Sequence, residues 1–306
     1  MKKGVRLINC ARGGIYDEAA LAEALKNGQV AGAAIDVFPE EPPTDRTLID
    51  QPQTVVTPHL GASTKEAQEN VAVDVAIEVI KVLKGESFKN AVNLPPLRPE
   101  VRTAIQPYFA LMEALGKITG QLAKPGITKL EVSYLGEISK LETTYLSTLF
   151  LKGILQASLG DEVTPVNALY LAKERGIKVI EHKLPDVTGY SSLIQVTAAT
   201  EKETHTLAGT VIGTDGNRIV EIEGYHFDIV PAGNLVLINH TDQPGVIGEV
   251  GTLIGQHGIN IAAMQVGRKQ QGGNALMVLN VDSAPNGVIE KLEKAKTVAK
   301  AWAISL

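Results

Sequence analysis

Three polar side chains of complementary chemistry follow three apolar segments near the beginning of the sequence: Arg12, Glu41 and His59. Histidine titrates near neutral pH and suits proton transfer, and a carboxylate beside it stabilises the imidazolium and fixes the orientation of the ring. Arginine presents a planar fork that matches a carboxylate in a bidentate way. Together the three suit oxidation of an alcohol next to a carboxylate, with His59 taking the hydroxyl proton while hydride leaves the same carbon.

The segments that precede these residues predict strands of one parallel sheet. Residues 5–9, 30–37 and 54–57 are short and apolar, and Asp17 is predicted to cap a helix that stops at Gly28. Alternating strands and helices are typical of a parallel sheet, and the loops at the carboxyl ends of its strands share one edge. We therefore expect Arg12, Glu41 and His59 to converge at that edge.

A long helix is predicted next, from Ser63 to about Leu83, opened by a capping box of Ser63 and Glu66. The proline-rich residues 93–99 indicate a linker. Beyond it, a middle α+β block is predicted. Helices are expected at 100–124, 142–158 and 165–175. Strands are expected at 127–136, 177–183, 191–200, 204–212, 217–223 and 226–230, with a hairpin turn at 214–217.

The last block, from about residue 234, has the predicted order βαββαβ, which is the ferredoxin-like order. Its elements are expected at 234–240, 245–256, 259–268, 274–281, 285–296 and 298–305. The whole chain is thus expected to be α/β: part of a parallel, doubly wound sheet, then an α+β domain, then a ferredoxin-like domain.

Composition excludes several classes of function. The net charge is −5 and no run of five basic residues occurs, so we expect no nucleic-acid interface. No stretch of about eighteen apolar residues occurs, so we expect no membrane segment. The single cysteine, Cys10, excludes an internal disulfide and a cysteine-based zinc site, and we expect a cytoplasmic protein that holds no metal.

The segments INCARGG, AAIDVFPEEPP and TPHLGAST resemble the NAD-binding domain of the D-2-hydroxyacid dehydrogenases, and in particular the D-3-phosphoglycerate dehydrogenases. The resemblance implies that Arg12 orients the substrate, that Glu41 is the carboxylate partner, with Glu40 as the alternative, and that His59 is the acid/base. Surface charge for Arg12 and a purely structural role for His59 are the competing interpretations. The implied contacts to the nicotinamide end of NAD are Cys10, Ala11, Arg12, Asp36, His59, Gly61 and Ala62.

The segments NHTDQPGVIG and GINI resemble an ACT domain, an amino-acid sensor. The resemblance implies that His240, Asp242 and Asn260 contact L-serine across an interface between two such domains. The chemistry agrees, because Asp242 can receive an ammonium group and Gly245 lets a carboxylate approach backbone amides at a helix N-terminus. A helix cap without a ligand is the alternative. We expect a homo-oligomer formed through the last two domains.

The middle block resembles the intervening, allosteric domain of the longer D-3-phosphoglycerate dehydrogenases, on the segments KLEVSYLGEIS, GYSSLIQV and EIEGYHFDI. Arg218 and His226 match part of a phosphate-binding site of relatives, while Val230 stands where a relative has arginine, and surface charge is the alternative. The resemblance implies four parts. Residues 1–64 are the C-terminal part of an NAD-binding domain and residues 65–99 are a helix with a linker. Residues 100–232 are an intervening domain and residues 233–306 are an ACT domain.

The sequence holds no G-x-G-x-x-G, the loop that normally grips the pyrophosphate of a dinucleotide. We therefore expect a truncated chain that alone neither binds NAD tightly nor turns over. The leading hypothesis is a serine-regulated enzyme of serine biosynthesis that oxidises 3-phosphoglycerate to 3-phosphohydroxypyruvate. The alternatives are a stand-alone serine-binding regulatory protein with an inert dehydrogenase remnant, and a dehydrogenase of another 2-hydroxy acid.

Overall fold

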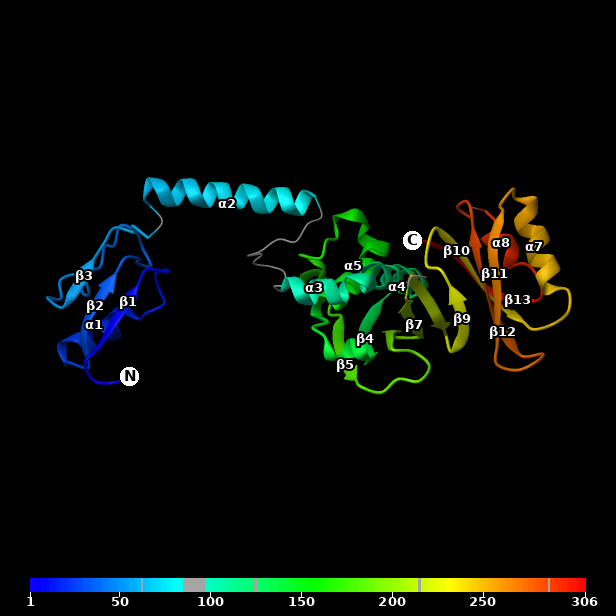
Figure 1. The fold of residues 1–306 in the computed structure, drawn as a ribbon, viewed down its shortest axis with the longest axis horizontal. Coiled ribbons are helices and arrows are strands. Elements are labelled where there is room, and N and C mark those ends of the chain that lie inside the picture. The colour runs from blue at the N-terminus through cyan, green and yellow to red at the C-terminus, as the bar shows by residue number, and fades with distance from the viewer. Residues whose placement is uncertain (62, 85–96, 124–125, 214–215, 286) are drawn as a thin grey trace. The chain divides into compact units, whose positions relative to one another are not determined.

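The computed structural model describes residues 1–61, 63–84, 97–123, 126–213, 216–285 and 287–306 (Figure 1). The chain divides into two compact units, residues 1–89 and residues 90–306, and each has its own apolar core. Among the described residues, none of the helices combines the length and the apolar character that a membrane crossing needs.

The first unit contains the predicted parallel sheet, in the order β1-β2-β3 (Figure 1). The strands are β1 (Val5–Asn9), β2 (Val30–Ile35) and β3 (Thr54–Val56), and the helix α1 (Glu18–Lys26) connects the first two. Asp17 caps α1 as predicted, because its carboxylate accepts from the backbone N–H of Ala20 at 2.9 Å. Residues of α1, β2 and the loop after it form the core, chiefly Leu21, Leu25, Val30, Ile35 and Phe38.

The long helix α2 (Lys65–Leu83) begins two residues later than predicted. Its cap is Thr64, whose hydroxyl accepts from the backbone N–H of Ala67 at 3.1 Å, so the predicted capping box of Ser63 and Glu66 is wrong. Ser63 instead donates its hydroxyl proton to the carbonyl oxygen of His59 at 2.8 Å. None of the residues of α2, all of which the structure describes, is buried. Most of the predicted linker, residues 93–96, lies outside the described residues.

The second unit opens with helices and a six-stranded sheet in the order β5-β4-β6-β7-β8-β9, in which only β4 and β5 pair in parallel. The predicted α+β block is confirmed, but the single helix predicted at 100–124 is divided in two by a short 3₁₀ turn at Gln106–Tyr108. The helices are α3 (Pro99–Ile105), α4 (Phe109–Leu122), α5 (Thr144–Leu159) and α6 (Ala168–Glu174). The strands are β4 (Ile127–Gly136), β5 (Lys178–Leu184), β6 (Ser192–Thr200), β7 (Thr204–Ile212), β8 (Gly216–Ile222) and β9 (Tyr225–Ile229). Residues 214 and 215 of the predicted hairpin turn lie outside the described residues.

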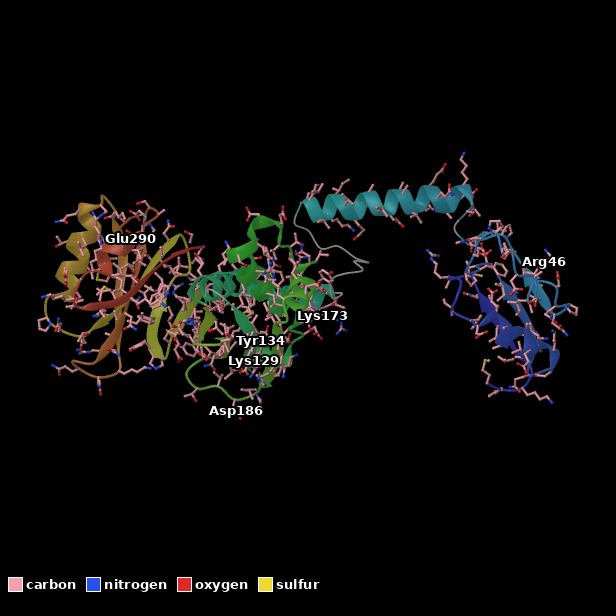
Figure 2. All side chains as sticks on the ribbon, turned by 180° about the vertical axis from the view of Figure 1, so that it is seen from behind. Arg46, Lys129, Tyr134, Lys173, Asp186 and Glu290 are labelled. Carbon is pink, nitrogen blue, oxygen red and sulfur yellow. The ribbon has the colours of Figure 1, made fainter. Side chains whose placement is uncertain are left out.

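Glycines let α4 and α5 pack at very short distance. A Cβ atom on Gly116 would lie 2.3 Å from the carbonyl oxygen of Phe150, and one on Gly153 would lie 2.5 Å from that of Glu113. Beneath these helices, Tyr134 of β4 is fully buried inside the unit (Figure 2), and its hydroxyl lies 2.7 Å from that of Ser147. Burial raises the pKa of Tyr134, so its hydroxyl stays protonated.

The chain ends in a four-stranded sheet with the order β11-β12-β10-β13, which is the ferredoxin-like arrangement (Figure 1). Its elements are β10 (Asn234–Thr241), α7 (Val246–Gln256), β11 (Ile261–Arg268), β12 (Asn274–Val281), α8 (Ile289–Leu292) and β13 (Val298–Ser305). The helix predicted at 285–296 is therefore much shorter. Because side chains alternate along β10, Val236 and Ile238 join the core with α7 and α8, while Leu235 and Leu237 join the core of the preceding block.

Candidate active site

The structure brings His59 and Glu41 together. His59 Nδ1 lies 2.7 Å from Glu41 Oε2, and Glu41 Oε1 accepts from the backbone N–H of Phe38 at 3.0 Å. The hydrogen bond with His59, and then that from Phe38, hold the pKa of Glu41 below its ordinary value. An ionised carboxylate only accepts hydrogen bonds, so Nδ1 carries the proton and Nε2 is left as the proton-accepting nitrogen. Glu40 instead accepts from the hydroxyl of Thr44.

A buried carboxylate sets the shape of the loop that carries His59. Asp36 Oδ1 accepts from the hydroxyl of Thr57 at 2.5 Å and from the backbone N–H of Leu60 at 2.7 Å, and Oδ2 accepts from Gly61 N–H at 2.9 Å. These bonds, that of Thr57 first, lower the pKa of Asp36. Between them, His59 adopts a left-handed backbone conformation with φ 56°. Sequence reasoning missed this anchoring, because it depends on where backbone N–H groups point.

Hydrogen bonds and close packing also fix the loops that follow β1 and β2. Asn9, the last residue of β1, accepts from the N–H of Ala11 and donates its amide to the carbonyl oxygen of Arg12 at 3.0 Å. Gly13 then packs against the chain after β2, where a Cβ atom would lie 2.1 Å from the carbonyl carbon of Phe38. Glycine at this position thus allows the loop of Arg12 to approach the loop of Glu41.

Arg12 itself is exposed, and its Nη1 donates to the carbonyl oxygen of Ala11 at 2.7 Å. A cavity of about 450 Å³ adjoins His59 and Glu41, and Arg12 is not among the described residues that line it. The cation on its wall is Arg46 (Figure 2), which pairs with Asp50 at 2.7 Å and was missed at the sequence level. The other lining residues are Asp36, Phe38, Pro42, Pro43, Ile49, Val56, Thr57 and Pro58.

The remaining predicted nicotinamide contacts are small residues of these loops. Cys10 and Ala11 are exposed on the loop after β1, and Gly61 follows His59. Ala62 lies outside the described residues. Within the part of the chain that the structure describes, no cluster of His, Cys, Asp and Glu side chains could hold a metal ion.

In the last sheet, Asp242 is already engaged. Its Oδ2 accepts from Arg268 Nη1 and from the backbone N–H of Gly272, each at 3.2 Å. The bond from Gly272, and then the one from Arg268, lower the pKa of Asp242, so the group is ionised near neutral pH. An ammonium ligand at this carboxylate would share it with Arg268.

The other predicted serine contacts differ in what they bond. His240 is buried, with Nδ1 2.9 Å from the carbonyl oxygen of Thr241, while Nε2 has no hydrogen-bond partner among the described residues. Asn260 donates to the carboxylate of Asp282 at 2.7 Å. Gly245, with φ 95°, precedes α7, whose first turn is capped by no side chain of the described part of the chain. Its N–H groups can therefore receive an anion.

The predicted phosphate contacts lie on β8 and β9. Arg218 Nε pairs with Asp228 Oδ1 at 3.0 Å, and Arg218 is largely buried, with 19% of its side chain exposed. His226, on the same hairpin, is exposed. Asp228 thus engages the Nε of Arg218, while the Nη1 of Arg218 donates to the carbonyl oxygen of Asn217 at 3.0 Å.

Comparison with known proteins agrees with this architecture. Residues 1–61 match the NAD binding domain of D-isomer specific 2-hydroxyacid dehydrogenases, residues 104–223 match the intervening domain of D-3-phosphoglycerate dehydrogenase, and residues 234–296 match the ACT domain. A crystal structure of a D-isomer specific 2-hydroxyacid dehydrogenase from Xanthobacter autotrophicus Py2, in complex with NADPH and MES, is 33% identical and covers 33% of this chain and 39% of its own, with a TM-score of 0.26.

Two curated relatives are both D-3-phosphoglycerate dehydrogenases. That of Bacillus subtilis is 48% identical over 281 residues, which is 92% of this chain and 54% of the relative. That of Methanocaldococcus jannaschii is 41% identical over 307 residues, which is 100% of this chain and 58% of the relative. The chain spans just over half the length of these relatives. The three matched domains lie in the order seen in the fold, and the chain is similar to D-3-phosphoglycerate dehydrogenases along at least 92% of its length.

Proposed function

We propose that the whole protein to which this chain contributes oxidises 3-phosphoglycerate to 3-phosphohydroxypyruvate with NAD. The observation that carries the proposal is the 2.7 Å contact between His59 Nδ1 and Glu41 Oε2, which leaves Nε2 as a proton acceptor on an accessible side chain. A lone surface histidine has no such orienting partner. The pair is the arrangement that general acid–base catalysis requires.

In the proposed mechanism His59 Nε2 takes the proton of the substrate hydroxyl. Glu41 stabilises the imidazolium that forms, since its carboxylate is ionised and bonded to Nδ1. The guanidinium of Arg12 leaves the carbonyl oxygen of Ala11 and binds the substrate carboxylate in a bidentate way. NAD, when bound, supplies the acceptor for the hydride that leaves the alcohol carbon.

The residues present fit the nicotinamide end of NAD. Cys10, Ala11 and Gly61 offer small side chains on loops at one edge of the sheet, so a flat ring can approach the backbone beside His59. The sequence holds no G-x-G-x-x-G, the loop that usually binds the pyrophosphate of NAD. We propose that NAD binding of useful strength needs protein segments beyond these 306 residues.

The test is a chimera that joins this chain to the part of the Bacillus subtilis relative that the chain does not match. We expect the chimera to form NADH with 3-phosphoglycerate and not with D-lactate, and the chain alone to form none. Turnover of D-lactate in preference to 3-phosphoglycerate would support a dehydrogenase of another 2-hydroxy acid. A folded chimera that turns over neither substrate would refute the proposal.

We propose further that L-serine binds at the ACT domain, with its ammonium group at Asp242 and its carboxylate at the N–H groups that begin α7. The ionised Asp242 and the uncapped first turn after Gly245 support this orientation, and the unpartnered His240 Nε2 can accept from the serine hydroxyl. Binding that also uses Asn260 of a second copy makes the protein a homo-oligomer whose serine regulation is allosteric.

Calorimetry on the 306-residue chain tests the serine site. We expect L-serine to bind and Asp242→Ala to weaken its binding at least about tenfold, because a charge-assisted hydrogen bond is lost. Serine binding without NAD binding would also fit a stand-alone sensor, and the chimera separates that alternative from the enzyme. Absence of serine binding at millimolar concentration would refute the site.

We propose that Arg218 and His226 bind phosphate only weakly. An anion there has to displace Asp228 from Arg218, which is held at 3.0 Å. Asp228→Asn should therefore strengthen the binding of inorganic phosphate, and an unchanged affinity would leave these residues as surface charges.

A further inference from the structure

A second cavity, of about 390 Å³, lies between the six-stranded sheet and the last sheet of the second unit. His205 and Ile222 of the first of these sheets form one wall, and Leu237 and Trp302 of the other form the facing wall. The volume falls in the range of small-molecule sites, about 300–1,000 Å³. None of the residues assigned above to catalysis, serine or phosphate lines this cavity.

His205 is buried at this cavity, with 7% of its surface exposed. Its Nδ1 lies 3.1 Å from Glu223 Oε1, and because a carboxylate only accepts, Nδ1 carries a proton, so Nε2 is an acceptor whenever the ring is neutral. That Nε2 has no hydrogen-bond partner among the described residues. Pairing a buried polar atom is favourable, so Nε2 is available to the donor of a ligand.

A second acceptor stands beside it. Glu203 Oε2 lies 3.5 Å from His205 Nε2, and both groups line the cavity. A primary ammonium group has three N–H donors and one positive charge, so a single ammonium can donate to Nε2 and to the carboxylate together. The ligand group that suits both acceptors is thus an amine.

The rest of the lining describes the remainder of the ligand. Lys300 Nζ lies 4.0 Å from Glu203 Oε2 and 4.9 Å from the centre of the Trp302 ring, so it can meet a carboxylate at the cavity mouth. Among the apolar residues of the lining, Tyr225 and Trp302 are partly exposed and offer surface, whereas Leu122 and Ile222 are buried in the walls. An ammonium, a carboxylate and an apolar group are together the features of an apolar α-amino acid.

We propose that this cavity binds an apolar α-amino acid as its zwitterion. The ammonium group donates to His205 Nε2 and Glu203, the carboxylate binds Lys300, and the side chain packs against Tyr225 and Trp302. Because the two walls come from the intervening and ACT regions, the bound amino acid links them. The site differs from the serine site in its place, its residues and its preference for an apolar side chain.

Calorimetry with the 306-residue chain, titrated with L-leucine and L-phenylalanine, tests the proposal. The matched ligand control is 4-methylpentanoate, which is leucine without its amino group. The matched protein variants are Glu203→Gln and Glu201→Gln, since Glu201 is exposed on the same turn and does not line this cavity. Both substitutions are nearly isosteric and lie on an exposed turn, so both variants should fold.

We expect at least one of the two amino acids to bind and 4-methylpentanoate not to bind. Glu203→Gln should weaken binding about tenfold or more, as the loss of a charge-assisted bond predicts, and Glu201→Gln should leave it unchanged. Failure of both amino acids to bind at millimolar concentration would overturn the proposal. So would binding that Glu203→Gln leaves intact or that Asp242→Ala abolishes.

Discussion

The sequence predicts the partner of His59, which is Glu41, but not the backbone conformation that holds His59 in place. The pairing with Glu41 follows from residue types at the ends of neighbouring parallel strands, and sequence reasoning anticipated it. The left-handed backbone of His59 does not follow from residue types, because it is fixed by Asp36, which holds the N–H groups of Leu60 and Gly61. Asp36 therefore positions the loop of His59. The resemblance also implies that Asp36 contacts the cofactor.

The hydrogen-bond partners of long side chains are also not predictable from the sequence. Arg12 and Asp242 were assigned to ligands by their place in motifs, yet they bond to the carbonyl oxygen of Ala11 and to Arg268. Long or charged side chains bond to groups that lie close in space, and the sequence alone does not say which groups those are.

The carboxylate of Glu41 makes stability depend on pH at the residue scale. Its folded-state pKa lies below the ordinary value of 4.5, so its contribution is present above pH 4.5 and is lost as pH falls through the lowered pKa. We expect Glu41→Gln to destabilise the first unit at pH 7 and to have progressively less effect below pH 4.5. Urea unfolding followed by the NMR signals of Tyr16, the only tyrosine of residues 1–89, measures this. An equal effect at pH 7 and at pH 3 would contradict it.

At the scale of elements, helix starts show why a motif can be displaced by one residue. Asp17 caps α1 as predicted, but Thr64 rather than Ser63 caps α2. Both hydroxyl residues suit the role, and the choice falls to Thr64 because Ser63 donates to the carbonyl oxygen of His59. A local hydrogen bond within the loop of His59 thus accompanies the choice between the two hydroxyl caps.

Close helix packing gives a prediction with an internal control. Gly116→Ala in α4 would place a Cβ atom 2.3 Å from the carbonyl oxygen of Phe150 in α5, and we expect a loss of at least about 1–3 kcal/mol from overpacking. Gly251→Ala in α7 meets open space and should stabilise its helix by up to about 1 kcal/mol. Chemical denaturation of both variants measures the two signs. Equal effects would show that the α4–α5 contact is looser than described.

At the scale of the molecule, the order of the blocks was predictable, but the sharing of a core was not. The run of apolar residues in β10 indicates a strand buried on both faces, without saying what covers the second face. The structure assigns Leu235 and Leu237 to the core that begins with the intervening region. The ACT region and the intervening region are therefore one compact unit.

This arrangement predicts how the chain unfolds. Residues 1–89 have a small separate core, whereas residues 90–306 share a large one across both sheets. We expect two calorimetric transitions, a small one from the first unit and a larger one in which the intervening and ACT regions unfold together. Three transitions would mean that the shared core does not couple those regions. A single transition would mean that the first unit depends on the second.

The most direct test of the account is the activity of His59→Asn in the chimera with the Bacillus subtilis segment. Asparagine tolerates the left-handed backbone at this position but cannot take the substrate proton at neutral pH. We predict that kcat/KM with 3-phosphoglycerate falls about 10²–10⁴-fold while NAD affinity and folding are kept, and that Glu40→Gln changes little. Turnover of His59→Asn at the rate of the unchanged chimera would contradict the assignment of His59 as the acid/base.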